Sequence, residues 1–199
     1  MRIVVTRDDV AARVEALGHT AVLCPLIRVE PLGDDPIDAS GYDWLVVTSA
    51  NGAHELGRRG VMATRIAAIG PGTAEALREH GLHADLVAQT HTQEGLRDEL
   101  PPGRALLAAA EGARRDVLDA DFLPLYRTVE LTPPAPVGDL VLLMSGSAAR
   151  ALAATGARIP VVAIGPQTAA AARAAGLEVV AEAATNDLDG LVEAVGSLS

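Results

Sequence analysis

Short apolar runs alternate along the chain with segments in which apolar residues recur at helical spacing. The runs are rich in Val, Leu, Ile and Ala, which predicts buried strands. We expect ten strands, at 2–6, 20–25, 44–49, 66–70, 84–88, 104–110, 121–126, 140–145, 160–165 and 178–183. Eight helices are expected between them, at 8–17, 51–59, 73–80, 93–100, 113–118, 147–154, 168–175 and 188–195. This alternation is typical of an α/β fold with parallel sheets.

The second half of the chain repeats the first. "IGPGTAEALREHGL" from Ile69 returns as "IGPQTAAAARAAGL" from Ile164, 95 positions later. The same register aligns Thr90 with Thr185, Gly95 with Gly190 and Leu96 with Leu191. Upstream, "DWLVVTSANGAHEL" from Asp43 matches "DLVLLMSGSAARAL" from Asp139, and "PLIRVE" from Pro25 weakly matches "PLYRTVE" from Pro124. A duplicated unit of about 100 residues is too long for a solenoid repeat and predicts two similar α/β lobes.

Two proline-rich stretches, at 28–41 and 127–139, interrupt the alternation and are predicted to be extended linkers. If the chain crosses between lobes at both, one lobe is 36–127 and the other joins 1–29 to 132–199. The linkers are then at about 28–36 and 127–136, and five strands fall in each lobe. Two consecutive lobes are the simpler alternative.

Composition excludes several function classes. The net charge of −10 argues against nucleic acid or an anionic membrane as a partner. All 16 basic residues are arginine, so Schiff-base chemistry, pyridoxal-phosphate attachment and a P-loop lysine are excluded. Cys24 is the single cysteine, so no internal disulfide can form. No apolar span approaches the roughly 20 residues that cross a bilayer, and we expect a soluble, cytoplasmic protein.

Four strand-to-helix turns carry the candidate chemistry. Helix amino ends with free N–H groups and hydroxyls bind carboxylates or phosphates, and ligands of open α/β sheets lie beyond the carboxyl ends of the strands. The turns therefore predict a cleft for a molecule with several anionic groups. The alternative is that small residues serve turn geometry alone, but their retention in both copies favours a ligand. The candidate binding residues are Ser49, Asn51, Gly70, Thr73, Ser145, Gly146, Ser147, Gly165 and Thr168.

The order of "VTR", "VVTSANGA", "AAIGPGTAEALREHG", "LPLYRTVE", "LMSGSAAR" and "VAIGPQTAAAARAAGL" resembles the uroporphyrinogen-III synthase family over nearly the whole chain. The resemblance implies two flavodoxin-like lobes with parallel five-stranded sheets, joined by a two-stranded linker. It implies a lyase of heme and porphyrin biosynthesis that cyclises hydroxymethylbilane to uroporphyrinogen III. The terminal pyrrole ring is inverted, water is lost in a cleft between the lobes, and no cofactor is needed.

The same resemblance suggests roles for individual residues. Tyr126 is expected to face the cleft and to donate a proton to the departing hydroxyl, although it could instead be a linker residue packed against a lobe. Arg7 and Arg114 are candidate clamps for the substrate's eight carboxylates, with Arg115 as the alternative to Arg114. No metal is expected, because the histidines that cluster in sequence are loosely spaced; they are His80, His83 and His91.

The expected partner is a linear tetrapyrrole, bound by a monomer that contacts the preceding pathway enzyme only transiently. Two rival functions stay open. One is a non-catalytic, synthase-like module that binds a tetrapyrrole or another polycarboxylate. The other is a hinged, twin-lobed binding protein for a small ligand, against which the lack of a signal peptide weighs.

Overall fold

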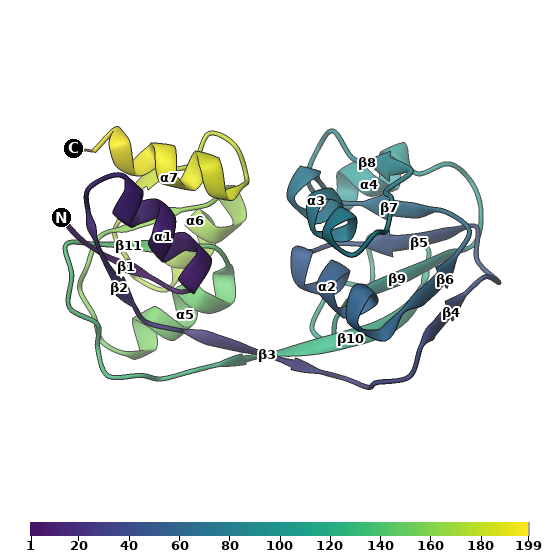
Figure 1. Ribbon diagram of the computed structural model, residues 1–199, viewed down its shortest axis with the longest axis horizontal. Helices are drawn as coiled ribbons and strands as arrows, with labels where there is room; N and C mark the ends of the chain where they lie inside the picture. The colour runs from purple at the N-terminus through teal and green to yellow at the C-terminus, as the bar shows by residue number, and fades with distance from the viewer. Residues whose placement is uncertain (199) are drawn as a thin grey trace. The chain divides into compact units, whose positions relative to one another are not determined.

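Parallel strand pairing dominates the chain. Within residues 1–198, which the computed structural model describes, there are thirteen strands and seven helices, as labelled in Figure 1. The strands form a five-stranded, a six-stranded and a two-stranded sheet. Contacts between Cα atoms divide the chain into two compact units, unit 1 (Met1–Arg28 with Val129–Ser199) and unit 2 (Val29–Thr128). No helix of the described residues is both long and apolar enough to cross a membrane.

Unit 1 is built on the five-stranded sheet, in which β1 lies between β2 and β11. Apolar side chains cover both faces, since alternate strand residues point to opposite sides. Helices α1 and α7 pack on one face, and α5 and α6 pack on the other (Figure 1). The elements are β1 (Arg2–Val5), α1 (Asp8–Ala16), β2 (Thr20–Leu23), β11 (Leu140–Leu143), α5 (Gly146–Ala154), β12 (Val161–Ala163), α6 (Pro166–Ala174), β13 (Val179–Glu182) and α7 (Leu188–Gly196).

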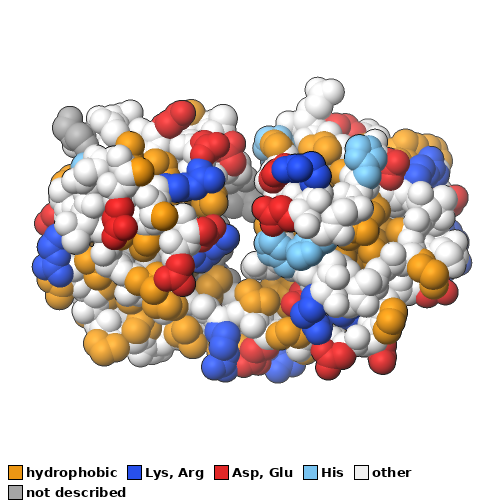
Figure 2. Space-filling view, viewed as in Figure 1, with side chains coloured by type: hydrophobic (Ala, Val, Ile, Leu, Met, Phe, Trp, Pro, Cys, Tyr) orange, Lys and Arg blue, Asp and Glu red, His pale blue; other side chains and the backbone are white. Residues whose placement is uncertain are grey.

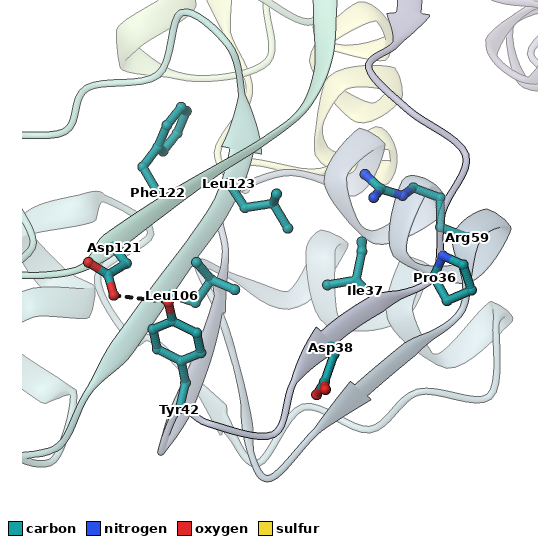
Figure 3. Close-up of a pocket in the computed structure, with 9 residues that line it drawn as sticks. All are labelled: Pro36, Ile37, Asp38, Tyr42, Arg59, Leu106, Asp121, Phe122 and Leu123. Carbon is teal, nitrogen blue, oxygen red and sulfur yellow. Dashed lines mark hydrogen bonds between the residues drawn. The ribbon is translucent and has the colours of Figure 1, made fainter.

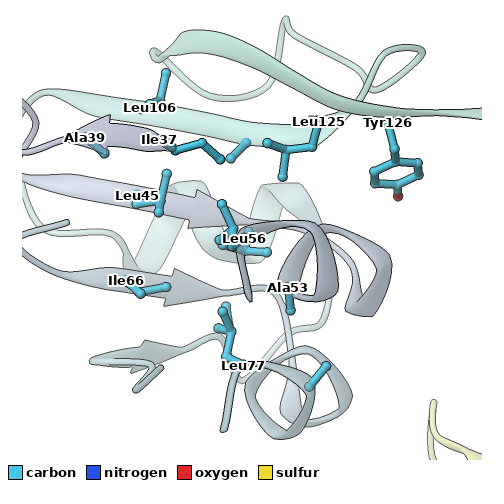
Figure 4. Packing of buried hydrophobic residues seen from close by; sticks show 14 residues of the cluster. Ile37, Ala39, Leu45, Ala53, Leu56, Ile66, Leu77, Leu106, Leu125 and Tyr126 are labelled. Atoms are coloured by element: carbon cyan, nitrogen blue, oxygen red, sulfur yellow. The ribbon is translucent and has the colours of Figure 1, made fainter. Parts of the chain in front are cut away.

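Unit 2 is built on the six-stranded sheet, with order β3-β10-β9-β5-β7-β8. Helices α2 and α3 cover one face and α4 the other. Figure 4 shows the cluster under α2 and α3, where Leu45, Leu56 and Leu77 meet and Tyr126 follows Leu125 at one end. The elements are β3 (Ile27–Pro31), β4 (Ile37–Ala39), β5 (Trp44–Val47), α2 (Ala50–Arg59), β6 (Val61–Ala63), β7 (Ile66–Ala68), α3 (Pro71–Glu79), β8 (Leu86–Val87), α4 (Gln93–Glu99), β9 (Ala105–Ala110) and β10 (Asp121–Glu130). Strand β3 begins, and strand β10 ends, with two residues of unit 1.

The two sheets have the same spatial order but different chain order. Unit 1 runs β13-β12-β11-β1-β2, and unit 2 contains the matching row β8-β7-β5-β9-β10. Within unit 1 the strands come in the order 2-1-3-4-5, a common doubly wound arrangement. Unit 2 enters the same arrangement at its third strand, β5, so its chain order is a circular permutation of that of unit 1.

The sequence prediction is right for the α/β fold and its parallel sheets, and wrong in two details. Segment 113–118 is irregular chain rather than a helix. Six residues offer too few helical hydrogen bonds to offset nucleation, and here the Arg115 guanidinium lies 3.9 Å from the Phe122 ring centroid and donates to the carbonyl of Glu111. The second detail is the count of strands, because the larger sheet has six and a small β4-β6 sheet was not expected.

The sixth strand comes from a segment predicted to be a linker. Strand β3 pairs with β10, and the pair is flanked by hydrogen bonds from Leu32 N–H to the Leu125 carbonyl and from Leu131 N–H to the Leu26 carbonyl. These bonds show that the two segments run in opposite directions. The alternating polar and apolar residues of both segments suit such a ladder, since one face of each strand is exposed.

One pair of duplicated aspartates has a structural role. The carboxylate of Asp43, just before β5, accepts a hydrogen bond from Arg104 N–H at 2.8 Å. Asp139, just before β11, accepts one from Arg2 N–H at 2.7 Å. In each unit the aspartate therefore joins the amino ends of two neighbouring parallel strands, which explains why both copies retain it.

Candidate active site

Two serines begin the helices that follow the central strands of the sheets. Ser49 caps α2, its Oγ accepting a hydrogen bond from Gly52 N–H at 3.0 Å, and Ser145 caps α5 by accepting from Ala148 N–H at 3.2 Å. Both serines are partly exposed. Each hydroxyl uses one lone pair for the cap and retains its proton for another acceptor.

The Gly-Pro turns follow β7 and β12, the strands that neighbour β5 and β11. Gly70 precedes α3 and Gly165 precedes α6, with proline as the first helical residue in both. Because β5 pairs with β7 and β11 pairs with β12, each serine cap and Gly-Pro turn share one carboxyl edge of a sheet. Each unit thus brings two of the four candidate turns to the same edge of its sheet.

Close packing explains the two glycines at these turns. A Cβ added at Gly70 would lie 3.0 Å from Cγ of His91, and one at Gly165 would lie 2.7 Å from Oδ1 of Asn186. His91 and Asn186 occupy equivalent positions, 95 residues apart. We did not include either residue in the predicted site, although the register of the duplication already pairs them.

The remaining turn residues differ in accessibility. Thr73 and Thr168 are 5% and 6% exposed, so their side chains pack inside their units. Ser147 is partly exposed and its Oγ accepts a hydrogen bond from Arg150 at 3.2 Å. Gly146 permits close approach of α5 to α6, since a Cβ there would lie 3.0 Å from that of Ala171.

Tyr126 lies beside the serine of unit 2. Its Oη is 2.8 Å from Ser49 Oγ, and only 5% of the residue is exposed. Burial raises the pKa of the Tyr126 phenol above its ordinary value, while hydrogen bonding with Ser49 and Asn51 acts in the opposite direction. The phenol is therefore protonated at neutral pH and can act as a donor.

Both arginines predicted to bind carboxylates already have carboxylate partners. Arg7 contacts Asp9 through Nε and Nη2, and Arg114 pairs with Glu94 at 2.9 Å. Both pairs are about half exposed. A substrate carboxylate would have to exchange with the protein carboxylate, which exposed pairs allow at little cost.

Comparison with known proteins identifies the family of this chain. The model of the family described as "Uroporphyrinogen-III synthase HemD" matches residues 8–193. The chain belongs to the uroporphyrinogen-III synthase family. Members of this family are cyclising lyases of porphyrin biosynthesis, and the sequence-based assignment to it is confirmed.

One solved structure of a synthase has a similar fold. A triple mutant of uroporphyrinogen III synthase from the extremely thermophilic bacterium Thermus thermophilus is 19% identical, with a TM-score of 0.64; the alignment covers 99% of this chain and 98% of that one. Another structure of the Thermus thermophilus synthase is 21% identical with a TM-score of 0.48, over 99% and 98% of the chains.

A pocket of about 340 Å³ in unit 2 lies apart from these synthase turns (Figure 3). It opens near the amino ends of β5 and β10, where the Tyr42 hydroxyl donates to Asp121 at 2.9 Å. Its walls combine apolar side chains with the charged residues Asp38, Arg59 and Asp121. We did not predict this pocket, because its residues come from separated segments that share no sequence motif.

Two histidines of unit 2 contact each other: His54 lies on α2, and His80 lies at the end of α3. His54 Nδ1 and His80 Nε2 are 2.9 Å apart, and Figure 2 shows histidine side chains over this part of the unit. Among the described residues, no group of three or more His, Cys, Asp or Glu could hold a metal ion. A histidine pair with a shared hydrogen bond accounts for the contact without a ligand.

The Arg114 pair leads to a prediction about substrate affinity. Its hydrogen bond holds the pKa of Glu94 below the ordinary value, so this carboxylate stays ionised at neutral pH and competes for Arg114. If Arg114 binds substrate, Glu94→Gln should lower the KM by about twofold to fivefold, the range expected for an exposed ion pair. Steady-state kinetics with hydroxymethylbilane would measure this.

Glu75→Gln is the matched control, since Glu75 pairs with Arg78 on α3, outside the predicted site. Its KM should equal that of the unmodified protein. An unchanged KM in Glu94→Gln as well would exclude Arg114 as a carboxylate ligand.

Proposed function

We propose that this chain cyclises hydroxymethylbilane to uroporphyrinogen III, with inversion of the terminal pyrrole ring and loss of water. The observation that carries the proposal is the family match over residues 8–193. The fold agrees with that match, since a synthase structure aligns over nearly the whole of both chains. We further propose that both units are flavodoxin-like lobes, which the strand order of unit 1 supports.

The protein's task in this reaction is to bind carboxylates and assist departure of a hydroxyl. We propose that the substrate carboxylates bind at the helix amino ends of each unit, through the caps and turns at Ser49, Gly70, Ser145 and Gly165. The partial positive charge of a helix amino end favours carboxylates without a basic patch. This suits a chain whose net charge is −10 and in which Arg7 and Arg114 are paired with acids.

The substrate supplies most of the driving force. Loss of its hydroxyl gives an azafulvene, and attack at the substituted carbon of the last ring gives a spiro intermediate that reopens and closes with the ring reversed. The protein contributes a proton donor and a conformation that favours this attack over direct closure. Tyr126 with Ser49 is the proposed donor group, because the protonated phenol and the serine hydroxyl lie within hydrogen-bond distance.

The finer statements about assembly and location are also proposals. We propose a monomer in the cytoplasm that contacts the enzyme supplying hydroxymethylbilane only transiently. The linear substrate closes spontaneously to the type I isomer, so a short path between the two enzymes would favour the type III product.

Separation of isomers tests the proposed function. Purified, metal-free protein is given freshly made hydroxymethylbilane, the products are oxidised, and type I and type III uroporphyrin are separated. We expect type III to dominate over the spontaneous type I background. Type I alone would overturn the synthase assignment and favour the rival module, which binds a polycarboxylate without catalysis.

A further inference from the structure

The arrangement of Ser49, Asn51 and Tyr126 suggests which hydroxyl meets the substrate. Tyr126 is 5% exposed and packs within the core cluster under α2 and α3, whereas Ser49 is partly exposed at the amino end of α2. Ser49 is therefore more accessible to solvent than Tyr126. A ligand at this turn reaches the Ser49 hydroxyl more readily than the Tyr126 hydroxyl.

The polar contacts around Tyr126 indicate which groups donate hydrogen bonds and which accept them. Asn51 acts to lower the pKa of the phenol, which is the effect of a side-chain N–H directed at the phenolic oxygen. The proton of a buried phenol needs an acceptor, and Ser49 Oγ is available at 2.8 Å. The Gly52 N–H occupies one lone pair of Ser49 Oγ, and the Tyr126 O–H can occupy the other. Ser49 then has its own O–H free to donate outward.

Comparison of the two units supports the same direction. Ser145 caps α5 as Ser49 caps α2, but the residue of unit 1 that aligns with Tyr126 is Ile27. Both units thus have a partly exposed serine at the cap, and of the two aligned positions only the one in unit 2 carries a phenol. This pattern suits a serine that contacts ligand in both units and a tyrosine that acts on the serine in one.

We infer that Ser49 is the residue whose hydroxyl donates to the departing oxygen of the substrate, and that Tyr126 is a positioning residue acting through Ser49. The inference rests on the proposed function and deepens it. It assigns the catalytic contact to the serine rather than to the tyrosine named by the sequence analysis.

The proton balance of this step closes within the site and substrate. As the C–O bond breaks, its electron pair stays on oxygen, which takes the proton of Ser49 and leaves as water. Ser49 takes the proton of Tyr126, and Asn51 donates a hydrogen bond to the resulting phenolate. Hydroxide is a stronger base than a phenolate, so the transfer runs downhill. The proton is returned when the closing ring loses one from carbon, consistent with water as the only by-product.

The test compares kcat and KM for type III formation in variants of the two residues. Ser49→Ala should lower kcat by roughly a hundredfold, within the range for loss of a general acid. Tyr126→Phe should lower it by roughly tenfold, since Ser49 can still donate a hydrogen bond. The double variant should be no slower than Ser49→Ala, because the phenol acts only through the serine. Ser49→Thr retains both hydroxyl and cap and should recover most of the rate.

Thr92→Ala is the matched control for loss of a helix cap. Thr92 caps α4 in the same unit, accepting from Gly95 N–H at 3.0 Å, the same distance as at Ser49. Its kcat should stay near that of the unmodified protein. A larger loss in Tyr126→Phe than in Ser49→Ala, or multiplicative losses in the double variant, would overturn the inference while type III formation upholds the proposed function. An unmodified protein that yields only type I would overturn both.

Discussion

Replacing Gly95 with alanine should destabilise unit 2 by roughly 2 to 4 kcal/mol, a large effect for one methyl group. A Cβ at this position would lie 2.1 Å from the carbonyl oxygen of Thr90 and 2.8 Å from its Cβ. The clash is with backbone, so the chain before α4 would have to move. Gly190→Ala should act similarly in unit 1, where the added Cβ would lie 2.2 Å from Oγ1 of Thr185.

Urea unfolding followed by circular dichroism would measure these losses. Gly72→Ala is the control, since Gly72 is an exposed residue in the first turn of α3 and no atom lies within 4 Å of its added Cβ. That variant should be neutral or gain up to about 1 kcal/mol from helix propensity. A stability of Gly95→Ala equal to that of Gly72→Ala would contradict the close approach of Thr90.

Truncation of the duplicated core leucines should destabilise the two units by similar amounts. Leu56 of α2 and Leu152 of α5 are both fully buried and occupy equivalent positions. Each alanine variant should lose about 2 to 5 kcal/mol, because a cavity is left as well as lost apolar burial. The effect at Leu56 also reaches the helix that carries Ser49 and Asn51.

Hydrogen exchange would locate these losses. Leu56→Ala should speed amide exchange in α2 and β5, and Leu152→Ala should speed it in α5 and β11, the elements that pack around each leucine. Leu17→Ala is the control, since Leu17 is 46% exposed and should change stability by less than about 0.5 kcal/mol. Equal exchange in both leucine variants and the control would show that these side chains are not core residues.

Much of the fold could be predicted from the sequence, because most strands of this structure are marked by apolar runs. Strands in parallel sheets are buried on both faces, so continuous apolar runs such as that at β11 mark them clearly. Two of the three missed strands, β4 and β6, have three residues each and pair only with one another. A strand of three residues is too short to form an apolar run that predicts a strand.

The candidate site was less predictable, because a turn can be retained in both copies for more than one reason. We took retention of residues in both copies as evidence for a ligand. Yet Gly95 and Gly190 admit a neighbouring threonine, and Gly70 and Gly165 admit His91 and Asn186. Packing thus accounts for several retained positions. The hydrogen bond between Ser49 and Tyr126 joins residues 77 positions apart, which no local pattern could reveal.

The insertion of unit 2 between two strands of unit 1 has a consequence for the newly made chain. Unit 2 is contiguous, so all its strands have been synthesised by Glu130. Strand β1, however, lies between β2 and β11, and β11 begins at Leu140. The sheet of unit 1 therefore stays incomplete, with only β1 and β2 synthesised, until all of unit 2 has left the ribosome. Synthesis reaches unit 1 first, but unit 2 is the first that can finish folding.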